Sequence, residues 1–374
     1  MRVVVAPDKF KGCLTAAEVA AAVAAGLLAR RPGLEVDQLP VADGGDGTVA
    51  AALGAGYARV DVDAVGPTGD PVCSAYARDG SRAVVELADV VGLDRLPHGR
   101  TDALGASTFG LGLVLRDAIH RGATEIMLGI GGSASTDGGA GMVQAMGARL
   151  LDASGHELPL GGAALADLDR LELTGLRELL TGVSVVVASD VTNPLLGPNG
   201  AAAVFGPQKG AGPSDVARLE AALATWARVV NDVTGTDLAE LPGAGAAGGT
   251  GFAAISLLDA EVRPGIDLVL NLIGFAEAVA GADLVITGEG SLDEQSLAGK
   301  APFGVAQAAA RANVPVVAVA GRNLLGPDQL RGAGIRHAYP LAELEPDLER
   351  SMLDAPRLLH QVGGAIAEAW LPVT

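Results

Sequence analysis

The chain has 374 residues and a mass of 37.2 kDa, a length that favours two domains or one large domain. Its 26 Lys and Arg residues against 44 Asp and Glu residues give a net charge of -18, which disfavours nucleic acid and anionic lipid as partners. No apolar run is long enough to cross a bilayer, and Cys13 and Cys73 are too few for a disulfide scaffold, so we expect a globular cytoplasmic protein.

The N-terminal 58 residues contain two predicted β-loop-α units. A β-branched run predicts a strand at 2–6, and the capping-box spacing of Thr15 and Glu18 predicts a helix to about residue 30. A second strand near 35–41 leads into a Gly-rich loop and a short helix at 49–53. This repeated order is typical of a parallel sheet.

From residue 59 apolar and polar residues alternate, which is the period of a β-strand. Turn-forming residues at 66–71 and at Asp79-Gly80 separate three such runs, so we expect an antiparallel meander. The predicted strands lie at 59–64, 72–78 and 82–87. We place a domain boundary near residue 58.

The remaining chain alternates helical and strand patterns. Predicted helices lie near 101–121, 141–151, 267–280 and 301–312. Predicted strands lie at 125–130, 183–188, 284–287, 316–320 and 335–339. The strands of the first and last segments suffice for a flavodoxin-like, doubly wound parallel sheet that is discontinuous in sequence. The expected fold class is therefore α/β, with residues 1–58 plus 269–374 in this domain and residues 59–268 inserted as a second α/β domain.

Ligands of open parallel sheets bind beyond the carboxyl ends of the strands, and Gly-rich loops follow those ends here. The segment 129–141 offers unhindered N–H groups before a helix, so Gly131, Gly132 and Ser133 are predicted to cradle an anion. The segment has neither the P-loop nor the dinucleotide-binding spacing. A second small-residue run, 243–251, indicates either another close backbone approach or a hinge.

Only four of the 26 basic residues are lysines, and all four lie within or beside Gly-rich loops. A compact ammonium group suits the bridging of phosphate oxygens. We expect Lys11, Lys209 and Lys300 to neutralise phosphate or carboxylate charge, with Lys9 as the fourth member. The alternative is that lysine is simply tolerated in exposed loops.

Phosphoryl transfer needs acidic groups that hold Mg²⁺ and accept the proton of the attacking hydroxyl. Asp190 and Asp293 are the best placed acids, and the sequence leaves open which of them has which role. Glu289 is predicted to bind the cofactor, whereas several other acidic residues in loops are predicted to cap the loops. The five histidines are isolated and no G-x-S-x-G motif occurs, which disfavours hydrolase chemistry.

Six motifs, in order and spread over nearly the whole chain, resemble those of the bacterial glycerate kinase family. They are APDKFKG at 6–12, ADGGDGT at 42–48, GIGGSASTDGGAG at 129–141, DVTNPLLG at 190–197, VFGPQKGA at 204–211 and GEG through GK at 288–300. The resemblance implies a flavodoxin-like domain joined to a second α/β domain. It also implies an ATP- and Mg²⁺-dependent kinase that phosphorylates D-glycerate, which we expect to occur at the 2-hydroxyl.

The chain departs from the family pattern at three positions. Lys9 and Cys13 stand where the family usually has Ser, and Thr136 stands where it usually has Asn. The resemblance therefore favours Lys11 over Lys9 as a functional residue.

We expect MgATP and glycerate to meet in a cleft between the domains, with Asp190, Asp293 and Lys11 as the catalytic residues. Gly131, Gly132, Ser133, Lys209, Lys300 and Glu289 are the predicted cofactor-binding residues. A kinase for another small hydroxy acid and a non-catalytic sensor of nucleotides or organic phosphates remain alternatives. A nicotinamide-dependent dehydrogenase is a third, disfavoured by the missing fingerprint. The sequence leaves the oligomeric state and the choice between the 2- and 3-hydroxyl open.

Overall fold

A computed structural model describes residues 1–294, 296–298 and 300–372. The contacts divide the chain into two compact units. Unit 1 comprises Met1–Asp43, Ala50–Ala55 and Ile266–Thr374, and unit 2 comprises Gly44–Val49 and Gly56–Gly265. Within the described ranges, no helix has the length and apolar character that crossing a membrane requires.

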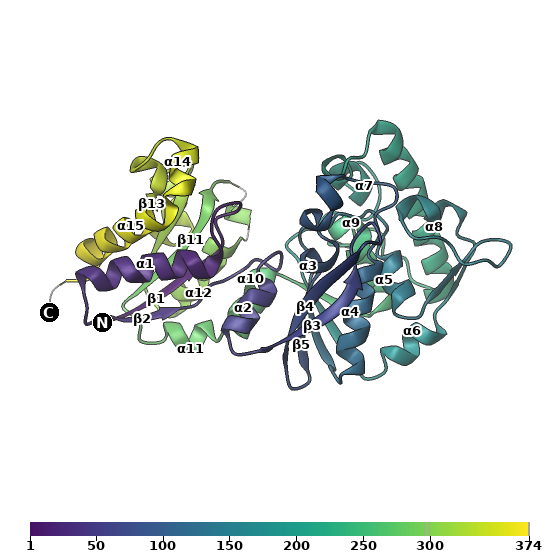
Figure 1. The fold of residues 1–374 in the computed structure, drawn as a ribbon, viewed down its shortest axis with the longest axis horizontal. Coiled ribbons are helices and arrows are strands. Elements are labelled where there is room, and N and C mark those ends of the chain that lie inside the picture. The colour runs from purple at the N-terminus through teal and green to yellow at the C-terminus, as the bar shows by residue number, and fades with distance from the viewer. Residues whose placement is uncertain (295, 299, 373–374) are drawn as a thin grey trace. The chain divides into compact units, whose positions relative to one another are not determined.

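Unit 1 is built on a five-stranded parallel sheet with the order β13-β12-β11-β1-β2 (Figure 1). Its strands are β1 (Arg2–Pro7), β2 (Glu35–Gln38), β11 (Leu284–Leu292), β12 (Val316–Asn323) and β13 (Ile335–Pro340). Counted along the chain within the unit, this order is 2-1-3-4-5, which is the flavodoxin-like order. The expected discontinuous, doubly wound sheet is therefore confirmed.

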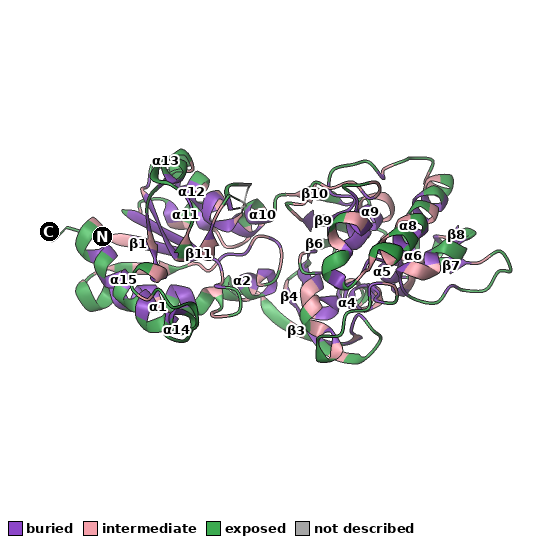
Figure 2. Cartoon of the chain, turned by 90° about the horizontal axis from the view of Figure 1, so that it is seen from above, coloured by how far each residue is buried: buried purple, intermediate pink, exposed green. Residues whose placement is uncertain are grey.

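The helices of unit 1 cover both faces of this sheet. Figure 2 shows α1 (Ala16–Arg30) and α15 (Ala355–Trp370) on one side and α11 (Phe275–Val279) and α12 (Ala301–Arg311) on the other. The α1 helix begins at the predicted capping box, in which Thr15 and Glu18 bond to each other's backbone. The α1 and α15 helices pack so closely that a Cβ at Gly26 would lie only 2.0 Å from the carbonyl oxygen of His360. Only glycine permits this contact.

Unit 2 contains a six-stranded mixed sheet with the order β10-β9-β6-β5-β4-β3. Its strands are β3 (Ala58–Val65), β4 (Pro71–Asp79), β5 (Arg82–Glu86), β6 (Glu125–Gly129), β9 (Ser184–Ala188) and β10 (Glu261–Arg263). The β3, β4 and β5 strands form the predicted antiparallel meander, and β5, β6, β9 and β10 run parallel. The carboxyl ends of the four parallel strands therefore lie at one edge of the sheet.

Helices and a small hairpin complete unit 2. The helices are α3 (Leu87–Val91), α4 (Phe109–His120), α5 (Ala140–Ala145), α6 (Thr174–Leu179), α7 (Ala201–Phe205), α8 (Pro213–Thr234) and α9 (Ala246–Leu257), while α2 (Thr48–Gly54) spans both units. The core is apolar and includes Trp226, which packs edge-on against Phe252.

Several predicted element boundaries were wrong. The helix expected at 141–151 ends at Ala145, because Gly147 has a φ of +107° and Arg149–Leu151 forms the hairpin strand β7 with β8 (Arg170–Glu172). The segment 267–280 is broken by the left-handed Gly274 into α10 (Gly265–Leu272) and α11. The helix expected from 101 begins only at Phe109.

The predicted strand at 284–287 is longer in the structure and reaches Leu292. The extension pairs with β12 as far as the Leu292 and Asn323 partners. Residues expected to form a loop, including Glu289, are therefore held in a strand.

Candidate active site

The switch point of the unit 1 sheet gathers charged side chains. The strand order reverses between β1 and β11, so the loops that leave these neighbouring strands diverge and leave room for a ligand. Pro7 at the end of β1 is the register partner of Gly288, and the N–H of Asp8 donates to the Gly288 carbonyl at 2.7 Å. Asp8 and Glu289 therefore meet at the position where open α/β sheets bind ligands.

Glu289 is the most unusual residue at this switch point. It is 8% exposed, and its Oε1 has no hydrogen-bond partner in the described part of the chain. Burial raises the pKa of Glu289 to about 7, against the opposing effects of a Ser296 hydrogen bond and the Lys300 ammonium group. The negative charges of Asp8 and Asp293 add to the increase in this pKa. Glu289 thus lies close to three other charged side chains, Asp8, Asp293 and Lys300.

Asp293 and Lys300, both predicted site residues, belong to the same region. The Oδ1 of Asp293 accepts the N–H of Ser296 at 3.2 Å, and the N–H of Asp293 donates to the Ser296 hydroxyl at 3.1 Å. Lys300 occupies the N-cap position of α12. Asp293 therefore stabilises a tight turn in addition to any chemical role.

The loop after β1 brings two more lysines. Lys11 is exposed, and its backbone nitrogen would lie 3.5 Å from a Cβ at Gly290. Lys9 pairs with Asp8, whose Oδ1 lies 3.7 Å from the lysine Nζ and accepts the Lys9 N–H at 2.7 Å. Unit 1 therefore brings together four predicted residues: Lys11, Glu289, Asp293 and Lys300.

The second set of predicted residues lies at the carboxyl ends of β6 and β9 in unit 2. We call residues 129–133 the Gly131 loop and residues 44–49 the Gly44 loop. A Cβ at Gly129 would lie 2.6 Å from the Gly44 carbonyl oxygen, and one at Gly131 would lie 2.7 Å from the Gly45 Cα. The two loops therefore pack backbone against backbone, with no space for side chains.

Asp190 follows β9 and contacts Gly265, the last residue of unit 2 along the chain. Its Oδ1 accepts the N–H of Gly265 at 3.2 Å. A Cβ at Gly44 would lie 2.9 Å from both the Gly265 Cα and the Ala188 Cβ. Gly131, Gly132, Ser133 and Asp190 thus share one edge of the unit 2 sheet, as predicted from the strand ends.

Lys209 lies beneath this edge and not on its surface. It is 2% exposed, and its ammonium group donates to the Ser135 carbonyl. Burial lowers the pKa of Lys209 to about 7, although the Asp137 carboxylate partly opposes the decrease. Three left-handed residues, Ala247, Gly248 and Gly249, bring the second small-residue run against Ser135 and Lys209. In this structure Lys209 stabilises the backbone at Ser135, just after the Gly131 loop.

Asp137 has the capping role expected of a loop acid. It is fully buried, and its Oδ2 accepts the N–H of Thr108 at 2.7 Å and the Thr108 hydroxyl at 2.8 Å. The N–H of Gly141 donates to the same oxygen at 3.2 Å. The carboxylate therefore joins the start of α4 to the start of α5.

Sequence reasoning missed one buried carboxylate of unit 2, Glu86. It ends β5, where Glu86 pairs with Gly129 of the neighbouring strand. Its carboxylate accepts the N–H groups of Gly47 and Val49, each at 3.1 Å from Oε2. The rule that selected Asp190 did not select Glu86, because the sequence predicted 82–87 as part of an antiparallel meander, whereas β5 pairs in parallel with β6.

The acidic residues suit Mg²⁺ by their chemistry. In the described ranges no three His, Cys, Asp or Glu side chains are arranged to hold a metal ion by themselves. Mg²⁺ prefers oxygen ligands and is usually held by one or two carboxylates together with substrate phosphates. The unpartnered Oε1 of Glu289 beside Asp8 and Asp293 fits that requirement.

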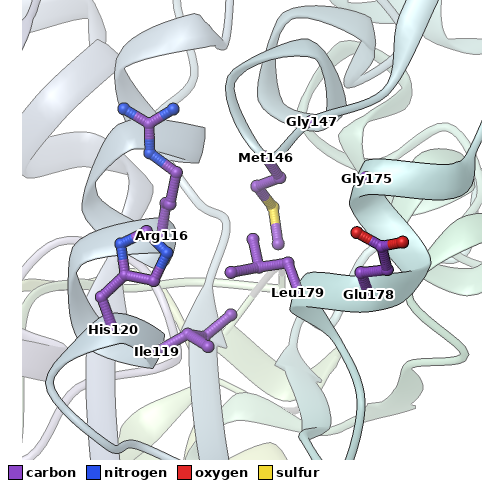
Figure 3. Close-up of a pocket in the computed structure, with 8 residues that line it drawn as sticks. All are labelled: Arg116, Ile119, His120, Met146, Gly147, Gly175, Glu178 and Leu179. Atoms are coloured by element: carbon purple, nitrogen blue, oxygen red, sulfur yellow. The ribbon is translucent and has the colours of Figure 1, made fainter.

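A cavity of about 460 Å³ lies elsewhere in unit 2, between α4 and α6 (Figure 3). Its lining residues are Arg116, Ile119, His120, Met146, Gly147, Gly175, Glu178 and Leu179. These helices end just before β6 and β9 begin, so the cavity lies toward the opposite edge of the sheet from the Gly131 loop. No predicted site residue lines it.

A family model described as "Glycerate kinase family" matches residues 3–371. The glycerate kinase of Halalkalibacterium halodurans is 42% identical over 369 residues, which cover 98% of this chain and 97% of that protein. The chain belongs to the glycerate kinase family. A glycerate 2-kinase of Escherichia coli K12 is 43% identical over 324 residues, which cover 86% of this chain and 85% of that protein.

A solved relative agrees in fold. The crystal structure described as "putative glycerate kinase 2 from Salmonella typhimurium LT2" is 40% identical, with a TM-score of 0.85 over 98% of this chain and 97% of that one. The glycerate kinase family confirms the enzyme class expected from the motifs, a phosphotransferase with an alcohol acceptor. A kinase family also implies a nucleotide as phosphoryl donor. The role of each site residue stays a prediction.

Proposed function

We propose that this chain transfers the γ-phosphoryl group of ATP to the 2-hydroxyl of D-glycerate and releases 2-phosphoglycerate and ADP. The observation that carries the proposal is the group of charged residues at the switch point of the unit 1 sheet, where Lys11 and Lys300 lie with Glu289 and Asp293. Lysines suit phosphate and carboxylate oxygens, and carboxylates suit a proton or Mg²⁺. Family membership and the 2-kinase relative support the same reaction.

In the proposed reaction the glycerate 2-oxygen forms a bond to the γ-phosphorus, and the bond from that phosphorus to the ADP oxygen breaks. The hydroxyl proton passes to a carboxylate, and Asp190 and Asp293 divide proton acceptance and metal binding. Mg²⁺, bound with the nucleotide, supplies neutralisation of phosphate charge. Lys11 and Lys300 neutralise the remaining phosphate or substrate carboxylate charge, and the N–H groups of the Gly131 loop bind an anionic group.

The cleft between domains that the sequence led us to expect stays a prediction. So do the cytoplasmic location, the dependence on Mg²⁺ and the contact of Lys209 with phosphate. The burial of Lys209 favours a supporting role behind the Gly131 loop.

An ADP-release assay with MgATP tests this function. D-Glycerate, L-glycerate, glycolate and lactate are compared as acceptors, and we expect the highest kcat/KM with D-glycerate. Enolase added to the product distinguishes its position, because only 2-phosphoglycerate is dehydrated without a mutase. Faster turnover of another acid would favour the broader hydroxy-acid kinase, and nucleotide binding without acceptor-dependent ADP release would favour the sensor.

A further inference from the structure

Glu86 occupies a position that is costly for a carboxylate. It is 5% exposed at the end of β5. Burial raises the pKa of Glu86 to about 7, and the charges of Asp46 and Asp89 add to this increase. The N–H groups of Val49 and Gly47 oppose it by donating hydrogen bonds to the carboxylate. A buried acid of this kind needs a reason beyond packing.

The hydrogen bonds of Glu86 go to one short segment of the chain. The N–H of Gly47 lies 3.2 Å from Oε1 and 3.1 Å from Oε2, and the N–H of Val49 lies 3.1 Å from Oε2. Both donors belong to the Gly44 loop, which is the short stretch of unit 2 between two stretches of unit 1. Gly47 has a φ of +102°, so this loop has an unusual backbone that needs external support.

The Gly44 loop in turn packs on the predicted anion cradle. The Gly44 carbonyl faces Gly129, and the Gly45 backbone faces Gly131 at distances that exclude a Cβ. Such backbone contacts have no side chains that could adapt, so a displacement of one loop is transmitted to the other. The carboxylate of Glu86 therefore acts on the Gly131 loop through the Gly44 loop.

We propose that Glu86 is a positioning residue, which holds the Gly44 loop across the ends of β6 and β9 and thereby fixes the anion-binding N–H groups of the Gly131 loop. Its two carboxylate oxygens accept the N–H groups of Gly47 and Val49, whereas an amide has one accepting oxygen and would turn its NH₂ group toward the N–H of Gly47. Only the kinetic test of this positioning role depends on the proposed function.

Two measurements on the full-length Glu86→Gln variant test this role. Hydrogen–deuterium exchange should become faster at residues 44–49 and at residues 129–133, while the rest of unit 2 keeps the protection of the wild type. With MgATP and D-glycerate, the KM for an anionic substrate should rise about tenfold or more, with a smaller change in kcat, because a charge-assisted contact is lost. The exchange measurement stands even if the wild type phosphorylates a different acid.

Asp89→Asn is the matched control. The Asp89 carboxylate is close to Glu86, but its bonds go to the Ser74 hydroxyl, the Ala75 N–H and Arg95. This variant should leave exchange in both loops unchanged. Glu86→Asp serves as the second variant if Glu86→Gln does not fold, and it should lie between the wild type and Glu86→Gln.

Two results would overturn the proposal. One is wild-type exchange in both loops of a folded Glu86 variant. The other is faster exchange spread evenly over unit 2 with unchanged KM, which would make Glu86 a structural residue alone.

Discussion

At the scale of single residues, burial separates side chains that look equivalent in the sequence. Lys11 is exposed beside Gly290, whereas Lys209 is enclosed behind Ser135. The gathering of lysines at Gly-rich loops could be predicted from their positions along the chain. The burial of Lys209 could not, because it depends on the left-handed residues Ala247–Gly249, which lie far away in the sequence.

The buried ammonium group of Lys209 should make stability depend on pH. Its pKa is lowered from 10.5 to about 7 in the folded state. Between these two values only the unfolded chain binds the proton, so the free energy of unfolding should increase with pH over this range. Urea denaturation of the wild type and Lys209→Met at several pH values should show a difference that changes by at most about 1.4 kcal/mol per pH unit. Parallel pH dependences would contradict this prediction.

Asp293 combines a predicted chemical role with an observed structural one. Asp293→Ala should lower kcat by about 100-fold or more, because it removes both the charge and the proton acceptor. Asp293→Asn keeps an oxygen for the Ser296 N–H and should lose activity to a similar extent with a normal melting temperature. The exposed neighbour Glu294 offers a control, Glu294→Gln, that should retain kcat. Near-normal turnover of either Asp293 variant would remove Asp293 from the chemistry.

At the scale of elements, local signals located the buried strands well and their ends poorly. The β-branched runs of β1 and β12 and the capping box of α1 needed no knowledge of the tertiary structure. The far end of β11 did, because Ser291 and Leu292 become strand only by pairing with Arg322 and Asn323. Glu86 was overlooked because it stands in an apolar stretch, where its bonds to a loop 37 to 39 residues earlier leave no local pattern.

The backbone contact between the Gly44 and Gly131 loops should not tolerate a methyl group. Gly131→Ala would place its Cβ 2.7 Å from the Gly45 Cα, so the loops must separate. We expect a loss of about 1–3 kcal/mol of stability and a lower kcat/KM. Thermal unfolding and steady-state kinetics measure the two effects. Gly54→Ala is the matched control, since a Cβ there meets no atom within 4 Å. Equal behaviour of the two variants would refute the close contact.

At the scale of the whole molecule, the chain builds two separate apolar cores. One contains Val3, Val317 and Leu359 in unit 1, and the other contains Leu115, Trp226 and Phe252 in unit 2. The discontinuity of unit 1 was predictable, because a meander interrupts the β-α order after the first two units and the closing elements of the chain resume it. The net charge of -18 was a poor guide to ligands, because it averages over the loops where the lysines gather.

Two cores should give two cooperative unfolding transitions. Calorimetry of the full chain is expected to show two unfolding transitions, whereas a two-state protein shows one. Leu359→Ala should shift the transition of unit 1, and Leu115→Ala that of unit 2, each by the equivalent of about 2–5 kcal/mol. A single transition that both variants shift equally would show that the units unfold as one.

The order of synthesis gives the strand topology a consequence for the nascent chain. Strand β1 is an interior strand of its sheet, yet its partner β11 leaves the ribosome more than 270 residues later. Unit 2 can fold in that interval, whereas β1 has only β2 beside it and must wait for β11 on its other side. A stalled or truncated chain would therefore leave one side of this interior strand unpaired, and we expect chaperones to bind nascent chains most strongly before residue 292 emerges.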